Sequence, residues 1–184
     1  MDYAAGLELL KNQVSDERIL KHSLASAAVL RALARRLGQD EELWALAGLL
    51  HDLDYEQTAQ DMARHGLVSA DLLSQAGAPA EIIEAVKAHN AENLGLARTT
   101  PLDLALTAGE TITGLVIATT LVYPDKKLAS VKPKSVTKRM KEKAFAASVN
   151  REHILLCEKL DIPLPEFSAL AVEAMVGISD ELGL

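Results

Sequence analysis

The chain has 184 residues and a formal net charge of −7, with 19 Lys and Arg against 26 Asp and Glu. This length suits one domain with a sizeable core. Its 29 Ala and 31 Leu, beside only 3% aromatic residues, favour helices, so we expect an all-α fold. The single cysteine excludes a disulfide framework and a cysteine-based zinc site, and it favours a reducing, cytoplasmic location. The acidic balance argues against a general nucleic-acid-binding protein.

The first half of the chain predicts helices joined by short connections. We expect helices at about 2–13, 16–37 and 41–53, with Gly38 ending the second and Asp40 capping the third. The third is apolar nearly all round (LWALAGLL), which is typical of a helix at the centre of a core. A polar stretch and two short helices, at about 68–76 and 79–89, follow.

The second half begins with a helix-start signal at 100–103, where a Thr, a Pro and an Asp stand in the order TPLD. This helix is expected to end near Tyr123. Its apolar-rich run, 111–123, has about 13 residues against the ~20 needed to span a bilayer, and the N-terminus does not resemble a signal peptide, so no membrane partner is expected. A short helix capped by Ser135 and two helices, at about 150–160 and 164–182, complete the prediction.

Ionisable side chains interrupt this apolar pattern. His51 and Asp52 directly follow the apolar run LWALAGLL. An unpaired buried carboxylate costs roughly several kcal/mol, so Asp52 needs a cation or strong donors, and a metal ion would satisfy both residues. Three further histidines and one acid stand within or beside the predicted helices: His22, His65, His89 and Glu110.

The order of these residues resembles the HD-domain superfamily of metal-dependent phosphohydrolases, in its HDIG-type branch. The likeness covers about 18–121 and includes the stretches HSLASAAVLRALARRLG, AGLLHDLD, RHGLVSADLL and EIIEAVKAHN. It implies one domain over 1–184: a helical HD-domain bundle at about 16–123 with a C-terminal helical extension at about 124–184.

The resemblance also implies which side chains hold metal. One divalent ion (Mn, Fe, Co, Ni, Zn or Mg) would be bound by His22, His51, Asp52 and Glu110, and a second by Asp52, His65 and His89. Imidazole and carboxylate groups suit such metals and leave positions open for water and substrate. The implied reaction is hydrolysis of a phosphomonoester or phosphodiester in a nucleotide-like compound, by metal-activated water.

Two positions depart from the family pattern. Glu110 stands where the family usually has Asp, and Asp54 stands where the HDIG signature has Gly. Asp54 or Glu56 could donate a proton or hold an outer hydrogen bond, and we predict Asp52 and Glu56 as the catalytic residues. Two other functions stay open: a di-iron oxygenase with iron in the same cluster, and a metal or nucleotide sensor without turnover.

Lys126–Lys143 holds eight Lys or Arg and one acid, a local charge of +7 that leaves −14 for the rest. No aromatic residue is interleaved, so a stacking platform for RNA or DNA is not expected. Four cationic residues are predicted to bind substrate phosphate, with a solvated helix surface as the alternative: Arg18, Lys127, Lys132 and Lys134. We therefore expect a small phosphate-bearing substrate and no nucleic-acid polymer.

Three features fall outside this pattern. His153 is interpreted as a surface or satisfied helix histidine. Cys157 has no His or Asp arrangement around it and is interpreted as core packing. The apolar, Thr-rich helix that begins at Pro101 could supply the interface of a homodimer.

Overall fold

The computed structural model describes all 184 residues, and the chain is helical without strands. The first part consists of α1 (Tyr3–Gln13), α2 (Glu17–Leu37), α3 (Glu41–Leu50), α4 (Tyr55–Thr58), α5 (Leu67–Gln75), α6 (Ala80–His89) and α7 (Ala91–Leu94). The second part consists of α8 (Pro101–Leu121), η1 (Leu128–Ser130), α9 (Pro133–Arg139), α10 (Arg151–Ile154), η2 (Leu155–Leu160), α11 (Leu164–Val176) and α12 (Ser179–Leu182). The predicted all-α fold is confirmed.

Local sequence signals fix several helix ends where they were expected. Asp40 caps α3 through the N–H groups of Glu42 and Leu43, and Gly38 ends α2 in the left-handed conformation, at φ +65°. Thr100 and Asp103 form a capping box at the start of α8. These interactions satisfy N–H and C=O groups that have no partner inside the helix.

Other ends differ from the prediction. α3 ends at Leu50, and 51–54 form turns that carry the His-Asp pair. Ser135 does not cap a helix, because α9 begins at Pro133 and the Ser135 hydroxyl instead bonds Tyr123. The helix expected over 164–182 is two helices, α11 and α12, while 150–160 is a short α-helix continued by a 3₁₀-helix. α4 and α7 were not predicted.

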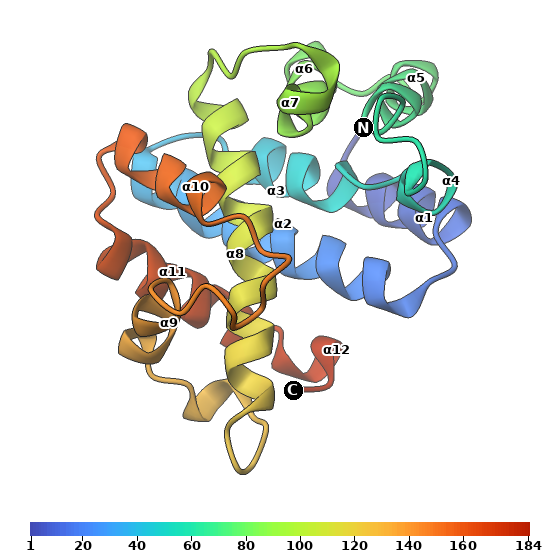
Figure 1. The fold of residues 1–184 in the computed structure, drawn as a ribbon. Helices are drawn as coiled ribbons and strands as arrows, with labels where there is room; N and C mark the ends of the chain where they lie inside the picture. The colour runs from blue at the N-terminus through green and yellow to red at the C-terminus, as the bar shows by residue number, and fades with distance from the viewer.

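α2, α3 and α8 meet at the centre of the molecule (Figure 1). Every residue of α3 from Trp44 to Leu50 is buried, as its uniformly apolar sequence predicts. Gly48 allows α2 and α3 to cross closely, because a Cβ there would lie 2.7 Å from the Ser26 carbonyl oxygen. This close crossing brings the end of α3 to the middle of α2.

The segment after α8 returns to the same core. α11 packs against α2 and α8, and α10 lies on α8 (Figure 1). By length and composition α8 could cross a bilayer, but 67% of its most apolar window is buried inside the protein. α8 is therefore a central core helix, and both the helices before it and the C-terminal extension pack against it.

Candidate metal centre

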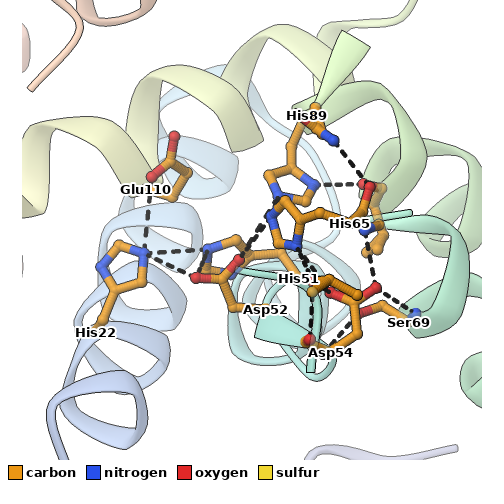
Figure 2. A network of polar contacts seen from close by, with 12 residues as sticks. His22, His51, Asp52, Asp54, His65, Ser69, His89 and Glu110 are labelled. Atoms are coloured by element: carbon orange, nitrogen blue, oxygen red, sulfur yellow. Dashed lines mark hydrogen bonds and ion pairs between the residues drawn. The ribbon is translucent and has the colours of Figure 1, made fainter. Parts of the chain in front are cut away.

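Four helices and one loop deliver ionisable side chains to one place. His22 comes from the second turn of α2, His51 and Asp52 from the turn directly after α3, and Glu110 from the middle of α8. His89 is the last residue of α6, and His65 lies in the loop before α5. Figure 2 shows these side chains converging around Asp52. The structure thus brings together all six residues predicted as metal ligands.

The first half of this cluster lies between α2, α3 and α8. The Nε2 atoms of His22 and His51 are 3.1 Å apart, and they lie 3.7 and 3.5 Å from Oδ2 of Asp52. The Oε2 atom of Glu110 is 3.7 Å from Nε2 of His22. His22, His51 and Asp52 offer ligand atoms within 4.8 Å of one another, close enough to share one ion.

The second half lies on the other side of Asp52. The Nε2 atoms of His65 and His89 are 2.9 Å apart, and they lie 3.3 and 3.6 Å from Oδ1 of Asp52. These three residues also offer ligand atoms within 4.8 Å of one another. Asp52 therefore presents one carboxylate oxygen to each half (Figure 2).

The Nδ1 atom of each of these histidines forms a hydrogen bond with a group outside the cluster. His51 Nδ1 donates to the Gly48 carbonyl at 2.8 Å, and His89 Nδ1 donates to the Val86 carbonyl. His65 Nδ1 donates to Asp54 at 2.8 Å. Because each of these partners can only accept, each ring carries a proton on Nδ1, and its Nε2 atom is the one that lies near Asp52.

The same holds for His22 because of a hydroxyl relay. Thr113 donates its hydroxyl hydrogen to the Glu110 carbonyl at 2.6 Å, so its oxygen accepts from His22 Nδ1 at 3.0 Å. The Nε2 lone pairs of the neutral His22 and His51 rings then face one another at 3.1 Å with no proton between them. A cation bound between them would remove this repulsion, so these residues fit the metal that the ligand set implies.

Burial and neighbouring charges perturb these groups strongly. Burial lowers the pKa of His51 to about 3 and raises that of Glu110 to about 8. Burial would also lower the pKa of His65, but Asp52 and Asp54 outweigh it and raise this pKa to about 9. Without a metal, His65 therefore holds a proton at pH 7, and a cation would take the place of that proton.

Asp54 supports the second half from behind. Its buried carboxylate accepts from His65 and from the backbone N–H groups of Gly66 and Ser69, at 2.8–2.9 Å. Gly66 has φ +85°, and a Cβ there would lie 3.1 Å from the Val86 carbonyl, so glycine lets this loop approach α6. Asp54 thus holds an outer hydrogen bond, one of the two roles that the sequence left open for it.

Several residues predicted to act at the site do not join the cluster. Glu56 instead bonds the Ser15 hydroxyl and the N–H groups of Ser15 and Asp16, just before α2. Arg18 has a side chain 91% exposed and pairs with Asp16 at 2.6 Å. The three predicted lysines are exposed, follow the C-terminal end of α8 and are absent from the pocket beside the cluster: Lys127, Lys132 and Lys134.

An open pocket of about 460 Å³ adjoins the cluster, a size typical of small-molecule sites. Asp52, His65, His89 and Glu110 form its inner lining. The rest of the lining comes from residues that sequence reasoning did not assign to the site: Tyr55, Met62, Asn90, Glu92, Asn93, Ser148, Asn150 and His153. A larger groove of about 680 Å³, between α2 and α11, contains none of the cluster residues.

His153 is a helix histidine with a hydrogen-bond partner, as the sequence indicated, but its position beside the pocket was not predicted. Its ring lines the pocket, and its Nε2 lies 3.2 Å from the Glu92 carboxylate. Glu92 also pairs with Arg98 at 2.6 Å, and Arg98 donates to the His89 carbonyl at 2.9 Å. No short-range sequence pattern links His153 to these residues, because they meet only through packing of the C-terminal extension.

The chain matches one known protein family within its first two thirds. A family model described as the HD domain matches residues 19–118, more than half of the chain. The chain therefore belongs to the HD domain family, and the resemblance drawn from its motifs is confirmed. All six clustered side chains lie inside the matched range.

Curated relatives are named Ribonuclease Y. The chain is 31% identical to that of Desulfotalea psychrophila over 98 residues, which cover 53% of this chain and 18% of the relative. It is 34% identical to that of Oleidesulfovibrio alaskensis over 74 residues, covering 40% and 14%. With that of Rubrobacter xylanophilus the identity is 24% over 170 residues, covering 90% and 32%. The chain thus spans less than a third of the length of these relatives, and no solved structure matches it.

Proposed function

We propose that this protein is a metal-dependent phosphohydrolase that cleaves a phosphomonoester or phosphodiester in a small, nucleotide-like substrate. One observation carries the proposal. Four histidines, each held by a hydrogen bond from Nδ1 to a group outside the cluster, direct their Nε2 atoms toward the two oxygens of Asp52, beside a pocket open to solvent. Membership of the HD domain family and the hydrolase names of the relatives support the same class.

The chain's own residues would act by position and charge. Asp52 would hold both halves of the centre together, and its pKa lies well below the usual value because His51, His65 and His89 outweigh the effect of burial. A divalent cation bound here would supply an activated water and positive charge for the phosphate oxygens. The pocket would orient the ester so that its phosphate lies against the cluster.

The phosphodiester backbone of RNA is a second candidate substrate. It is favoured by the name Ribonuclease Y that the relatives carry. The pocket lining favours a smaller substrate, because it includes no Lys or Arg that would contact successive phosphates. The two candidate substrates differ in size, so a panel of small phosphate esters and an oligoribonucleotide can distinguish them.

The test is a substrate panel assayed with purified protein and each of Mn²⁺, Co²⁺, Ni²⁺, Mg²⁺, Zn²⁺ and Fe²⁺. The panel contains phenyl phosphate, bis(p-nitrophenyl) phosphate, nucleoside monophosphates and a short oligoribonucleotide. We expect metal-dependent hydrolysis of the small esters, which His51→Ala abolishes and the surface variant Asp61→Asn retains. If no metal supports cleavage of any member, the proposal is wrong.

A further inference from the structure

The C-terminal extension contributes one wall of the pocket that holds the candidate metal centre. Ser148, Asn150 and His153 line it, facing the side formed by the cluster. They belong to the segment before α10 and to α10 itself, outside the residues matched by the HD domain model. This wall therefore comes from a part of the chain that the HD domain model does not cover.

The segment is held in place by close packing and by one arginine. A Cβ at Gly114, one turn after Glu110 on α8, would lie 3.2 Å from Val149, so glycine lets the segment lie close to the helix. Arg151 donates to the carbonyls of Ala146 and Val149 at 2.6 and 2.7 Å, and also to that of Phe145. These bonds fix the backbone on which Ser148 and Asn150 stand.

The groups on this wall are polar but carry no positive charge. Asn150 uses its Oδ1 to cap α10, accepting from the N–H groups of Glu152 and His153 at 3.0 and 3.3 Å, which leaves its amide NH₂ as a donor. The Ser148 hydroxyl can donate and accept. Burial lowers the pKa of His153, so its ring is neutral at pH 7.

The carboxylate beside the wall already has two partners. Glu92 lines the pocket, binds His153 and pairs with Arg98, and no Lys or Arg belongs to the pocket lining itself. Carboxylate, amide and hydroxyl groups together suit hydroxyl groups of a ligand, because each can exchange hydrogen bonds with an O–H. A second phosphate would find no cationic partner here, because the lining contains no Lys or Arg.

We propose that Ser148, Asn150 and His153 form a specificity wall for a neutral, hydroxyl-rich group, so that the substrate is a small phosphomonoester of a polyhydroxylated compound. This inference rests on the proposed hydrolase function. The metal centre would bind the phosphate, and the wall would bind the hydroxyl groups of the rest of the molecule.

The test compares kcat/KM for ribose 5-phosphate and for phenyl phosphate, using the full metal-loaded chain. The variants are Ser148→Ala and Asn150→Ser, since serine preserves an N-cap but removes the amide donor. We expect wild type to prefer ribose 5-phosphate, and each variant to lose about threefold to tenfold of that preference through KM. Hydrolysis of phenyl phosphate should fall less than that of ribose 5-phosphate in these variants, and both activities should be unchanged in the surface control Ser74→Ala.

Arg151→Lys tests the support of the wall. Arg151 does not line the pocket, so it is a positioning residue. We expect the same loss of preference, with unchanged Mn²⁺ affinity measured by calorimetry.

The outcomes separate this inference from the function on which it rests. Three results would overturn the proposed specificity wall but not the proposed hydrolase function. They are equal use of the two esters by wild type, equal losses on both esters in the variants, and a preference for an oligoribonucleotide. Absence of any hydrolysis would overturn the proposed function and the wall with it.

Discussion

The HD core and the C-terminal extension differ in how their sequences relate to the site. In the core, the ionisable side chains that interrupt apolar sequence are the ones that meet at the candidate metal centre, as His22, Asp52 and Glu110 show. In the extension, the conspicuous feature is the +7 segment, yet the pocket receives the unremarkable Ser148 and Asn150 instead. Local charge is therefore a poor guide to which residues face a site, whereas an ionisable group within an apolar helix is a good one.

The largest expected effect lies in the core. Asp52→Ala removes the carboxylate shared by both halves of the cluster, so neither half retains its ligand set. We expect loss of Mn²⁺ binding in calorimetry and a fall in kcat of about a thousandfold or more. The helical circular dichroism should persist. Near-normal metal binding in this variant would contradict the shared role of Asp52.

The pH dependence of metal affinity is the next largest effect. In the metal-free protein His65 and Glu110 have pKa values of about 9 and about 8, so both are largely protonated at pH 7. Binding a cation must release these protons, so affinity should rise with pH between about 6 and 8, by up to tenfold per unit for each proton. Calorimetry in buffers of different ionisation enthalpy measures this release. A flat or falling affinity would be inconsistent with ligation by these groups.

Asp54→Asn should have an intermediate effect confined to the second half of the cluster. The amide cannot match both His65 and the N–H groups of Gly66 and Ser69. We expect about a 10- to 100-fold loss of affinity at the His65 half and about 1–3 kcal/mol less stability to urea. The exposed Asp61→Asn is the matched control. An equal loss of affinity at both halves would contradict a role of Asp54 confined to the His65 half.

Glu110→Gln should have the smallest effect in the core. Burial raises the pKa of Glu110 to about 8, so the neutral amide resembles the protonated acid present at pH 7 without metal. We expect the unfolding free energy to change by less than about 1 kcal/mol, while Mn²⁺ affinity falls about tenfold. Glu110→Asp, which restores the residue usual in the family, should retain tighter binding than Gln. Unchanged affinity in the Gln variant would remove Glu110 from the ligand set.

The fold and the core of the site follow from local rules, and this is why they could be predicted. Caps at Asp40 and Thr100 and the apolar sequence of α3 specify helices whose ends lie within a few residues of the prediction. The break between α11 and α12 and the start of α9 at Pro133 were missed, because tertiary packing overrides weak local signals.

The outer part of the site could not be predicted, because its contacts join distant segments. His153 meets Glu92 across 61 positions of sequence. Conversely, Arg18 and Glu56 are occupied by partners beside the start of α2: Asp16 pairs with Arg18, and the N–H groups there bind Glu56. Side chains near a site in sequence can thus be drawn away from it by stronger local donors and acceptors.

The most direct test of the account is a crystal structure of the protein grown with Mn²⁺, with anomalous scattering recorded to locate the metal. We predict a peak at coordination distance, about 2.0–2.3 Å, from the Nε2 atoms of His22 and His51 and from Asp52. A second peak is predicted between Asp52, His65 and His89. A cluster without any anomalous peak at saturating Mn²⁺, its histidines bonded only to one another, would contradict the central claim.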